Sequence, residues 1–343
     1  MNRSTAVNSL NGPFAIRVSV GRPAPQTLAV LALVGANIIW GASAVASKAV
    51  LIHVPPMTLA CLRVAIACAL LLPLAARNGE RPARGSAPAA LGLTGVALFC
   101  FLQNVGLRYA SAANTALING AIPVVTALLA AVFLSERLDI RRVAGLVISG
   151  LGVAAVVLFG TGATLGASVV GNLLPVAGVV SFAVYAVLGR RAFASGNTLA
   201  VVAGSTRYGL LFLLPGAGLE LATVGSGPLT INDMLLLLYL GIGCSALAFI
   251  LCGYGLARLD AGQGAVFGNL KPLMGVGLAV VLLGEPLISG HLGGGALVLL
   301  GVLLASGNAG PEQRGAGAAI FHWRRVLLVP LDGSTPASCR RRR

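Results

Sequence analysis

The chain has 343 residues, of which 57% are hydrophobic and only 10% are charged, and its mean hydropathy is +0.92. These values exclude a water-soluble globular protein and indicate that the chain lies in a lipid bilayer. The net charge of +15 does not indicate a nucleic-acid partner, because the basic residues lie between apolar runs and do not cluster in a basic motif.

The first 26 residues precede any apolar run and contain Arg3, Arg17 and Arg22 together with three prolines. This composition favours a cytoplasmic leader over a cleaved signal peptide. Apolar runs of about 20 residues follow, the length that a helix needs to cross the hydrocarbon core. They predict an all-α polytopic membrane protein with ten transmembrane helices, at residues 27–47, 57–76, 88–108, 114–134, 142–160, 169–189, 198–219, 233–257, 262–283 and 290–308.

The connecting loops predict the orientation of these helices, since cytoplasmic loops retain an excess of Lys and Arg. On one side lie the leader, the arginine-rich loops near residues 77–84, 137–142 and 190–191, Arg258 and a basic tail at 309–343. On the other side only Arg108 lies in a loop. We therefore expect a multi-pass protein of a bacterial-type inner or plasma membrane with both termini in the cytoplasm.

An internal repeat divides the chain, because a shift of 149 residues aligns the end of each half without a gap. The shift pairs Gly106 with Gly255, Pro123 with Pro272, Glu136 with Glu285, Gly145 with Gly294 and Gly152 with Gly301. We predict a first repeat at residues 27–160 and a second at 161–308. Since each repeat has an odd number of helices, the two are inverted, which is a known basis for alternating access.

Several motifs resemble those of drug/metabolite transporters of the EamA type. They are Trp40-Gly41, Arg63, the stretch through Ala113, Pro123 and Glu136-Arg137-Leu138 to Gly145, and the second copy with Pro272 and Gly284-Glu285-Pro286-Leu287. The resemblance implies two inverted five-helix bundles, a central cavity lined mainly by helices one, three, four, six, eight and nine, and export or uptake of solutes. The sequence departs from the family at Lys271, where an acidic residue is common.

Four cations lie within the predicted spans, where a charge at the centre of a helix costs roughly 3 kcal/mol. Lys48 lies near the outer end of its helix, which favours snorkelling to water. For Arg63 and Arg207, bonding to backbone carbonyls and binding of substrate remain equal alternatives. Lys271, in mid-span beside Pro272, is the foremost predicted substrate-binding residue, the alternative being a bond to a carbonyl that the proline leaves free.

Neutral side chains that can line a cavity are also present in the spans. Those predicted to bind substrate are Trp40, Asn37, Asn104, Asn119, Tyr185 and Asn269, with Gln103 and Gln263 as further lining candidates. For each of them, a bond to a neighbouring helix is the alternative. Pro123, Pro272, Glu136 and Glu285 are expected to be structural, the glutamates bonding the first amides of the following helix or pairing with Arg137 or nearby arginines.

The central spans hold cations and no acidic residue, which favours an anionic or zwitterionic substrate. The sequence thus predicts a secondary carrier of small metabolites such as amino acids or carboxylates. An exporter of drugs or amines is the first alternative, and a membrane-embedded enzyme or scaffold is the second. We expect no enzymatic activity, cofactor or metal site, since the histidines and cysteines lack ligand spacing. A coupling proton or ion and a homodimer stay open.

Overall fold

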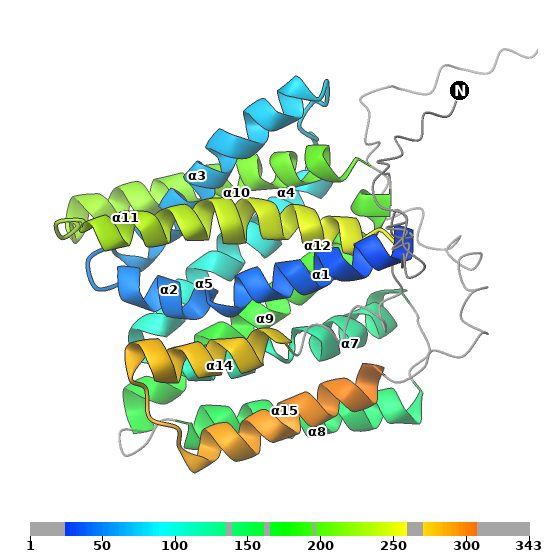
Figure 1. Ribbon diagram of the computed structural model, residues 1–343, viewed down its shortest axis with the longest axis vertical. Helices are drawn as coiled ribbons and strands as arrows, with labels where there is room; N and C mark the ends of the chain where they lie inside the picture. Colours follow the sequence, from blue (N-terminus) through cyan, green and yellow to red (C-terminus); the bar gives the residue numbers. More distant parts are fainter. Residues whose placement is uncertain (1–24, 135–138, 161–164, 195–196, 259–269, 307–343) are drawn as a thin grey trace, which may run out of the picture.

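The computed structural model describes residues 25–134, 139–160, 165–194, 197–258 and 270–306, in which all regular elements are helical (Figure 1). The first half contains α1 (Pro25–Gly41), α2 (Ser43–Val50), α3 (Pro56–Arg77), α4 (Ser86–Leu91), the π-helix η1 (Gly92–Leu98), α5 (Phe99–Tyr109), α6 (Ala112–Asn119), α7 (Ile122–Leu134) and α8 (Ile140–Phe159). The second contains α9 (Leu165–Ala194), α10 (Thr198–Thr223), α11 (Ile231–Leu238), the π-helix η2 (Tyr239–Leu247), α12 (Ala248–Leu256), α14 (Leu270–Leu283) and α15 (Ser289–Ser306).

Consecutive elements join into stretches with the length and composition of membrane spans. Within the described residues eight stretches, from Thr27–Val50 to Ile231–Gly255, are long and apolar enough to cross a bilayer, and α14 and α15 are shorter apolar helices. The prediction of an all-helical polytopic membrane protein is therefore confirmed. The span predicted at 262–283 begins outside the described residues, and α14 represents its second part.

Within the described residues, four of the predicted spans depart from a regular α-helix. The first is interrupted at Ala42 between α1 and α2, and the fourth at Gly120 and Ala121 between α6 and α7. Pro123 is the second residue of α7, which follows the second interruption, as expected for a residue that cannot donate a helical hydrogen bond. The third and eighth spans each contain a π-helix, η1 and η2, in the middle. Such segments rotate the side chains that follow and are frequent at functional sites.

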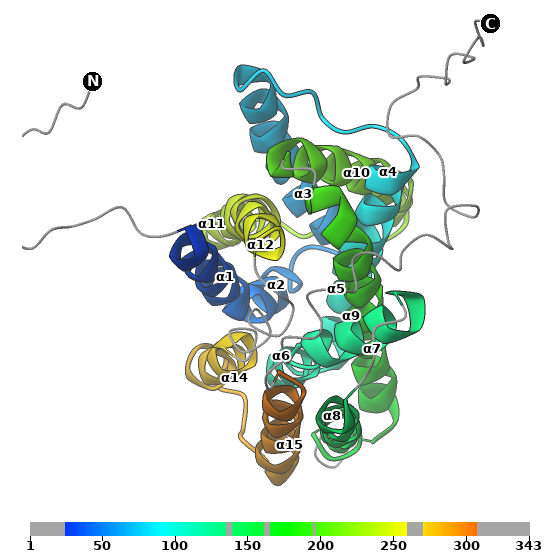
Figure 2. The same cartoon turned by 90° about the vertical axis from the view of Figure 1, so that its right-hand side faces the viewer.

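The helices α8 and α15 pack against each other along one edge of the molecule (Figures 1 and 2). Glycines allow this approach: a Cβ on Gly145 would lie 2.5 Å from the carbonyl oxygen of Gly301, and a Cβ on Gly152 would lie 2.8 Å from that of Gly294. The shift of 149 residues pairs Gly145 with Gly294 and Gly301 with Gly152, and a Cβ on Gly294 would lie 2.9 Å from the carbonyl oxygen of Gly152. The two contacts are therefore equivalent, as expected for inverted repeats related by a two-fold axis.

The π-helices repeat this relation in the middle of the molecule. Gly92 at the start of η1 packs against α10, where a Cβ would lie 2.4 Å from the carbonyl oxygen of Ser205. Gly241, its counterpart in η2, packs against α3, where a Cβ would lie 3.1 Å from the carbonyl oxygen of Arg63. The second span of each half thus packs against the third span of the other half: α10 against η1, and α3 against η2. This packing places Arg63 of α3 beside η2.

Candidate substrate cavity

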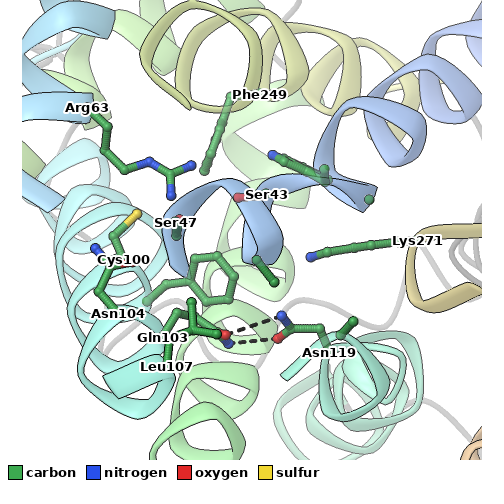
Figure 3. Close-up of a pocket in the computed structure, with 15 residues that line it drawn as sticks. Ser43, Ser47, Arg63, Cys100, Gln103, Asn104, Leu107, Asn119, Phe249 and Lys271 are labelled. Atoms are coloured by element: carbon green, nitrogen blue, oxygen red, sulfur yellow. Dashed lines mark hydrogen bonds between the residues drawn. The ribbon is translucent and has the colours of Figure 1, made fainter. Parts of the chain in front are cut away.

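A cavity lies between the two halves, at the level of the break between α1 and α2 (Figure 3). Helices of both repeats line it, namely α1, α2, α3, α5 and α6 from the first half and α12 and α14 from the second. The lining side chains include Trp40, Ser43, Ser47, Arg63, Phe99, Cys100, Gln103, Asn104, Leu107, Asn119, Phe249 and Lys271. None of these carries a carboxylate.

Trp40 forms the aromatic wall of the cavity at the end of α1. Its indole Nε1 donates a hydrogen bond of 2.9 Å to the carbonyl oxygen of Cys244 in η2. Its ring meets Phe182 and Phe249 edge-on, with centroids 5.8 Å and 5.5 Å apart. Such edge-to-face pairs add to the free energy of burial, so the indole is held in place from the second half.

Arg63 lies in α3 and is only 6% exposed. Its Nε donates a hydrogen bond of 2.9 Å to the hydroxyl oxygen of Ser245 in η2. This bond uses one of the five guanidinium N–H groups, and Figure 3 shows the terminal nitrogens at the cavity. Arg63 therefore connects the halves and also presents positive charge to the cavity.

Lys271 enters the cavity from α14, on the side opposite to Arg63 (Figure 3). Its Nζ lies 5.4 Å from the ring centroid of Trp40 and 5.8 Å from that of Phe99. These are cation–π distances. In the part of the chain that the structure describes, no carboxylate pairs with Lys271.

Amide side chains complete the polar surface. Gln103 of α5 and Asn119 of α6 bond each other reciprocally, Gln103 Nε2 donating to Asn119 Oδ1 at 2.7 Å and Asn119 Nδ2 to Gln103 Oε1 at 3.2 Å. Asn104 Nδ2 donates to the carbonyl oxygen of Pro56, 3.1 Å away at the start of α3. Its Oδ1 is buried without a partner in the described structure, so Asn104 retains one unused acceptor.

The structure places five of the predicted substrate-binding residues together at the cavity: Trp40, Arg63, Asn104, Asn119 and Lys271. Three others lie elsewhere. Asn37 donates to the carbonyl oxygen of Leu33 within α1, Tyr185 is buried among Phe182, Phe193 and Phe249, and Arg207 lies 5.2 Å from the ring centroid of Tyr208. Asn269 and Gln263 lie outside the described residues.

Sequence reasoning missed Ser43, Ser47, Cys100, Phe99 and Phe249. A signal for four of them exists. Ser43 and Ser47 follow Trp40 at three and seven residues, which would place them on its face of a regular helix. Phe99 and Cys100 precede Gln103 and Asn104 by four residues in the same way. No comparable signal marks Phe249, since phenylalanine also faces lipid or packs between helices.

The residues expected to be structural lie at junctions of helices. Pro272 is buried, and its Cγ would lie 3.1 Å from a Cβ on Gly120. Glu285 accepts hydrogen bonds from the backbone amides of Ala112 at 2.8 Å and Ala113 at 2.9 Å. The helix that Glu285 caps is thus α6 of the other half, not α15, which follows it in the sequence. Glu136 lies outside the described residues.

Lys48 joins this junction. Its Nζ lies 3.3 Å from the Glu285 carboxylate and donates a hydrogen bond of 2.6 Å to the carbonyl oxygen of Ala110. The side chain remains 34% exposed, so it both reaches water and holds protein groups.

Comparisons with known proteins agree with this architecture. The model of the EamA-like transporter family matches residues 27–158 and again residues 169–307. The uncharacterized transporter YetK of Bacillus subtilis is 28% identical over 287 residues, which are 81% of this chain and 87% of that protein. A probable terminal-alkyne amino-acid exporter of Streptantibioticus cattleyicolor is 32% identical over 252 residues, 72% of this chain and 80% of the exporter. One solved crystal structure, 27% identical, has a TM-score of 0.60 and covers 81% of this chain and 98% of its own.

Proposed function

Because the chain belongs to the EamA-like transporter family, we propose that it is a secondary carrier of small anionic or zwitterionic metabolites, such as amino acids or carboxylates. The observation that carries this substrate class is the pair of cations, Arg63 and Lys271, at a cavity where none of the described lining residues has a carboxylate. The cell membrane is its site of action, and transport proceeds by alternating access.

Electrostatics favours an anion in this cavity. A charged group removed from water loses solvation free energy, which an opposite charge nearby restores. Arg63 offers planar N–H groups that match a carboxylate, while Lys271 offers a compact charge on a flexible stem. A carboxylate lying between them would bond both halves of the carrier at once.

The rest of the cavity suits the neutral and donor parts of such a solute. The rings of Trp40, Phe99 and Phe249 provide an apolar surface, and the free Oδ1 of Asn104 can accept a hydrogen bond from an ammonium or hydroxyl group. The relative named a probable terminal-alkyne amino-acid exporter supports a zwitterionic substrate.

Thermal unfolding of the detergent-purified protein tests the substrate class, since a ligand that binds only the folded state raises its stability with saturation. Amino acids, carboxylates, sugar phosphates and lipophilic cations form the panel. We expect anions or zwitterions to raise the Tm and Lys271→Ala to abolish that rise. Arg207→Ala is the matched control, because it also removes a cation from a membrane span, and Arg207 does not line the cavity.

Two outcomes contradict the proposal. If only lipophilic cations raise the Tm, the aromatic wall binds the substrate and the protein exports drugs or amines. If Lys271→Ala leaves the stabilisation by anions intact while Arg207→Ala removes it, the substrate site lies elsewhere.

A further inference from the structure

The four helices that surround the cavity on the α14 side meet again at one end of the bundle. There α2 and α5 end, α6 begins, and α14 leads into Glu285. This end is opposite to the start of α1 and the end of α15 (Figure 1), so the arginine distribution predicts it to be the non-cytoplasmic face. We call it the outer face.

One carboxylate joins all four helices at the outer face. Glu285 follows α14 and bonds the first two amides of α6. Lys48, in the last turn of α2, pairs with Glu285 and donates to Ala110 at the end of α5. We call Lys48, Glu285, Ala110 and the amides of Ala112 and Ala113 the outer cluster.

The same four helices contribute Ser47, Gln103, Asn119 and Lys271 to the cavity. α14 of the second half therefore cannot separate from α2, α5 and α6 of the first half at the outer face while the outer cluster is intact. We propose that the outer cluster is the outer gate of the carrier, closed in this structure and broken whenever the cavity opens to the outer side. This inference rests on the alternating-access carrier proposed above.

The chemistry of the cluster suits a gate that opens and closes. Glu285 is only 12% exposed at its side chain while Lys48 is 34% exposed. Water can therefore solvate the lysine as soon as the pair separates. The Glu285 carboxylate makes charge-assisted hydrogen bonds to the start of α6. This is the positive end of the helix dipole, where a carboxylate is favoured.

Other outer-face bonds join different helices. Glu220 of α10 accepts from the backbone amide of Thr58 at 2.7 Å and from its hydroxyl at 2.9 Å, which caps α3. These hydrogen bonds join the second spans of the two halves, α3 and α10, and not the four helices of the outer cluster. Glu220 is therefore a matched control: the same residue type, on the same face, bonded to the start of a helix.

The test measures access to Cys100, which lines the cavity. A membrane-impermeant thiol reagent is applied to the outside of intact cells, without added solute, and mass spectrometry quantifies modification of Cys100. Loss of one charge-assisted hydrogen bond shifts an equilibrium about tenfold, so Glu285→Gln should raise the rate about tenfold. Lys48→Met, which keeps the amide bonds, should raise it less, and Glu220→Gln should not change it.

Several outcomes would overturn the gate. They are an unchanged Cys100 rate in a folded Glu285→Gln protein, an equal rise in Glu220→Gln, or a rise only when the reagent reaches the cytoplasmic side in inverted vesicles. Size-exclusion elution and the Tm show whether each variant is folded. Should Glu285→Gln fail to fold, the rate of Cys100 modification in Lys48→Met tests the gate in its place. Because the labelling uses no solute, its result is independent of the ligand panel that tests the proposed substrate class.

Discussion

Trp40, like Arg63, connects the two halves of the molecule at the cavity. It donates to the Cys244 carbonyl and packs edge-on against Phe182 and Phe249. Trp40→Phe keeps a ring and removes the donor, so we expect a loss of about 1 kcal/mol of stability. Trp40→Leu should cost more, because the ring contacts disappear as well. Unfolding in detergent gives the order, and a Trp40→Phe protein as stable as the native one would show that the indole bond contributes nothing.

Residues with charged or amide side chains were the predictable part of the cavity, since such groups are unusual inside a membrane. Lys271, Arg63 and Asn119 could be selected on that ground. Their orientation around the helix could not, and for this reason the sequence also predicts Asn37 and Tyr185, which the structure places away from the cavity. The wall contributed by Phe249 was not predictable, because an apolar side chain carries no sign of the surface that it faces.

At the scale of elements, the contact of α8 with α15 depends on glycines that leave no room for a side chain. Gly152→Ala places a Cβ 2.5 Å from the backbone nitrogen of Val298, so we expect the helices to move apart. The free energy of unfolding should fall by about 2 kcal/mol or more, and the Tm should fall with it. Gly150→Ala is the control, since a Cβ there meets nothing within 4 Å and alanine favours the helix by up to about 1 kcal/mol. Equal effects of the two changes would contradict the packing.

The positions of the helices were predictable from apolar runs and charged loops, because the bilayer fixes the length of a span. The interruption at Ala42 and the π-helices η1 and η2 were not. Hydropathy measures the average polarity of a segment and is insensitive to a local change of hydrogen-bond register. These irregular turns set which side chains reach the cavity, and so the helices were easier to predict than the site.

For the whole molecule, the inverted arrangement requires that corresponding loops lie on opposite sides of the membrane. Asn78, after α3, and Ser226, after α10, are both exposed. With Cys339 replaced by serine, we expect Ser226→Cys to react with an impermeant thiol reagent outside intact cells and Asn78→Cys to react only after permeabilisation. Reaction of both from the outside, or the reverse order, would contradict the predicted orientation.

The repeat itself was visible in the sequence as a register of glycines, a proline and a glutamate, whereas the exact repeat boundaries remain a prediction. Its physical meaning became visible only in contacts, such as those of Gly92 with α10 and Gly241 with α3. A pattern of 149 residues states that two segments are alike. It does not state which surfaces of the two segments touch.

The glycine contacts between α8 and α15 make this surface self-complementary. Replacing α15 by a second α8 in the opposite direction would convert the contact of Gly145 with Gly301 into a contact of Gly145 with Gly152. A half-length chain inserted into the membrane in both orientations would therefore possess the same surface for pairing with itself. Joining the two halves in one polypeptide fixes their stoichiometry and relative direction, and it leaves each half free to acquire its own cations at the shared cavity.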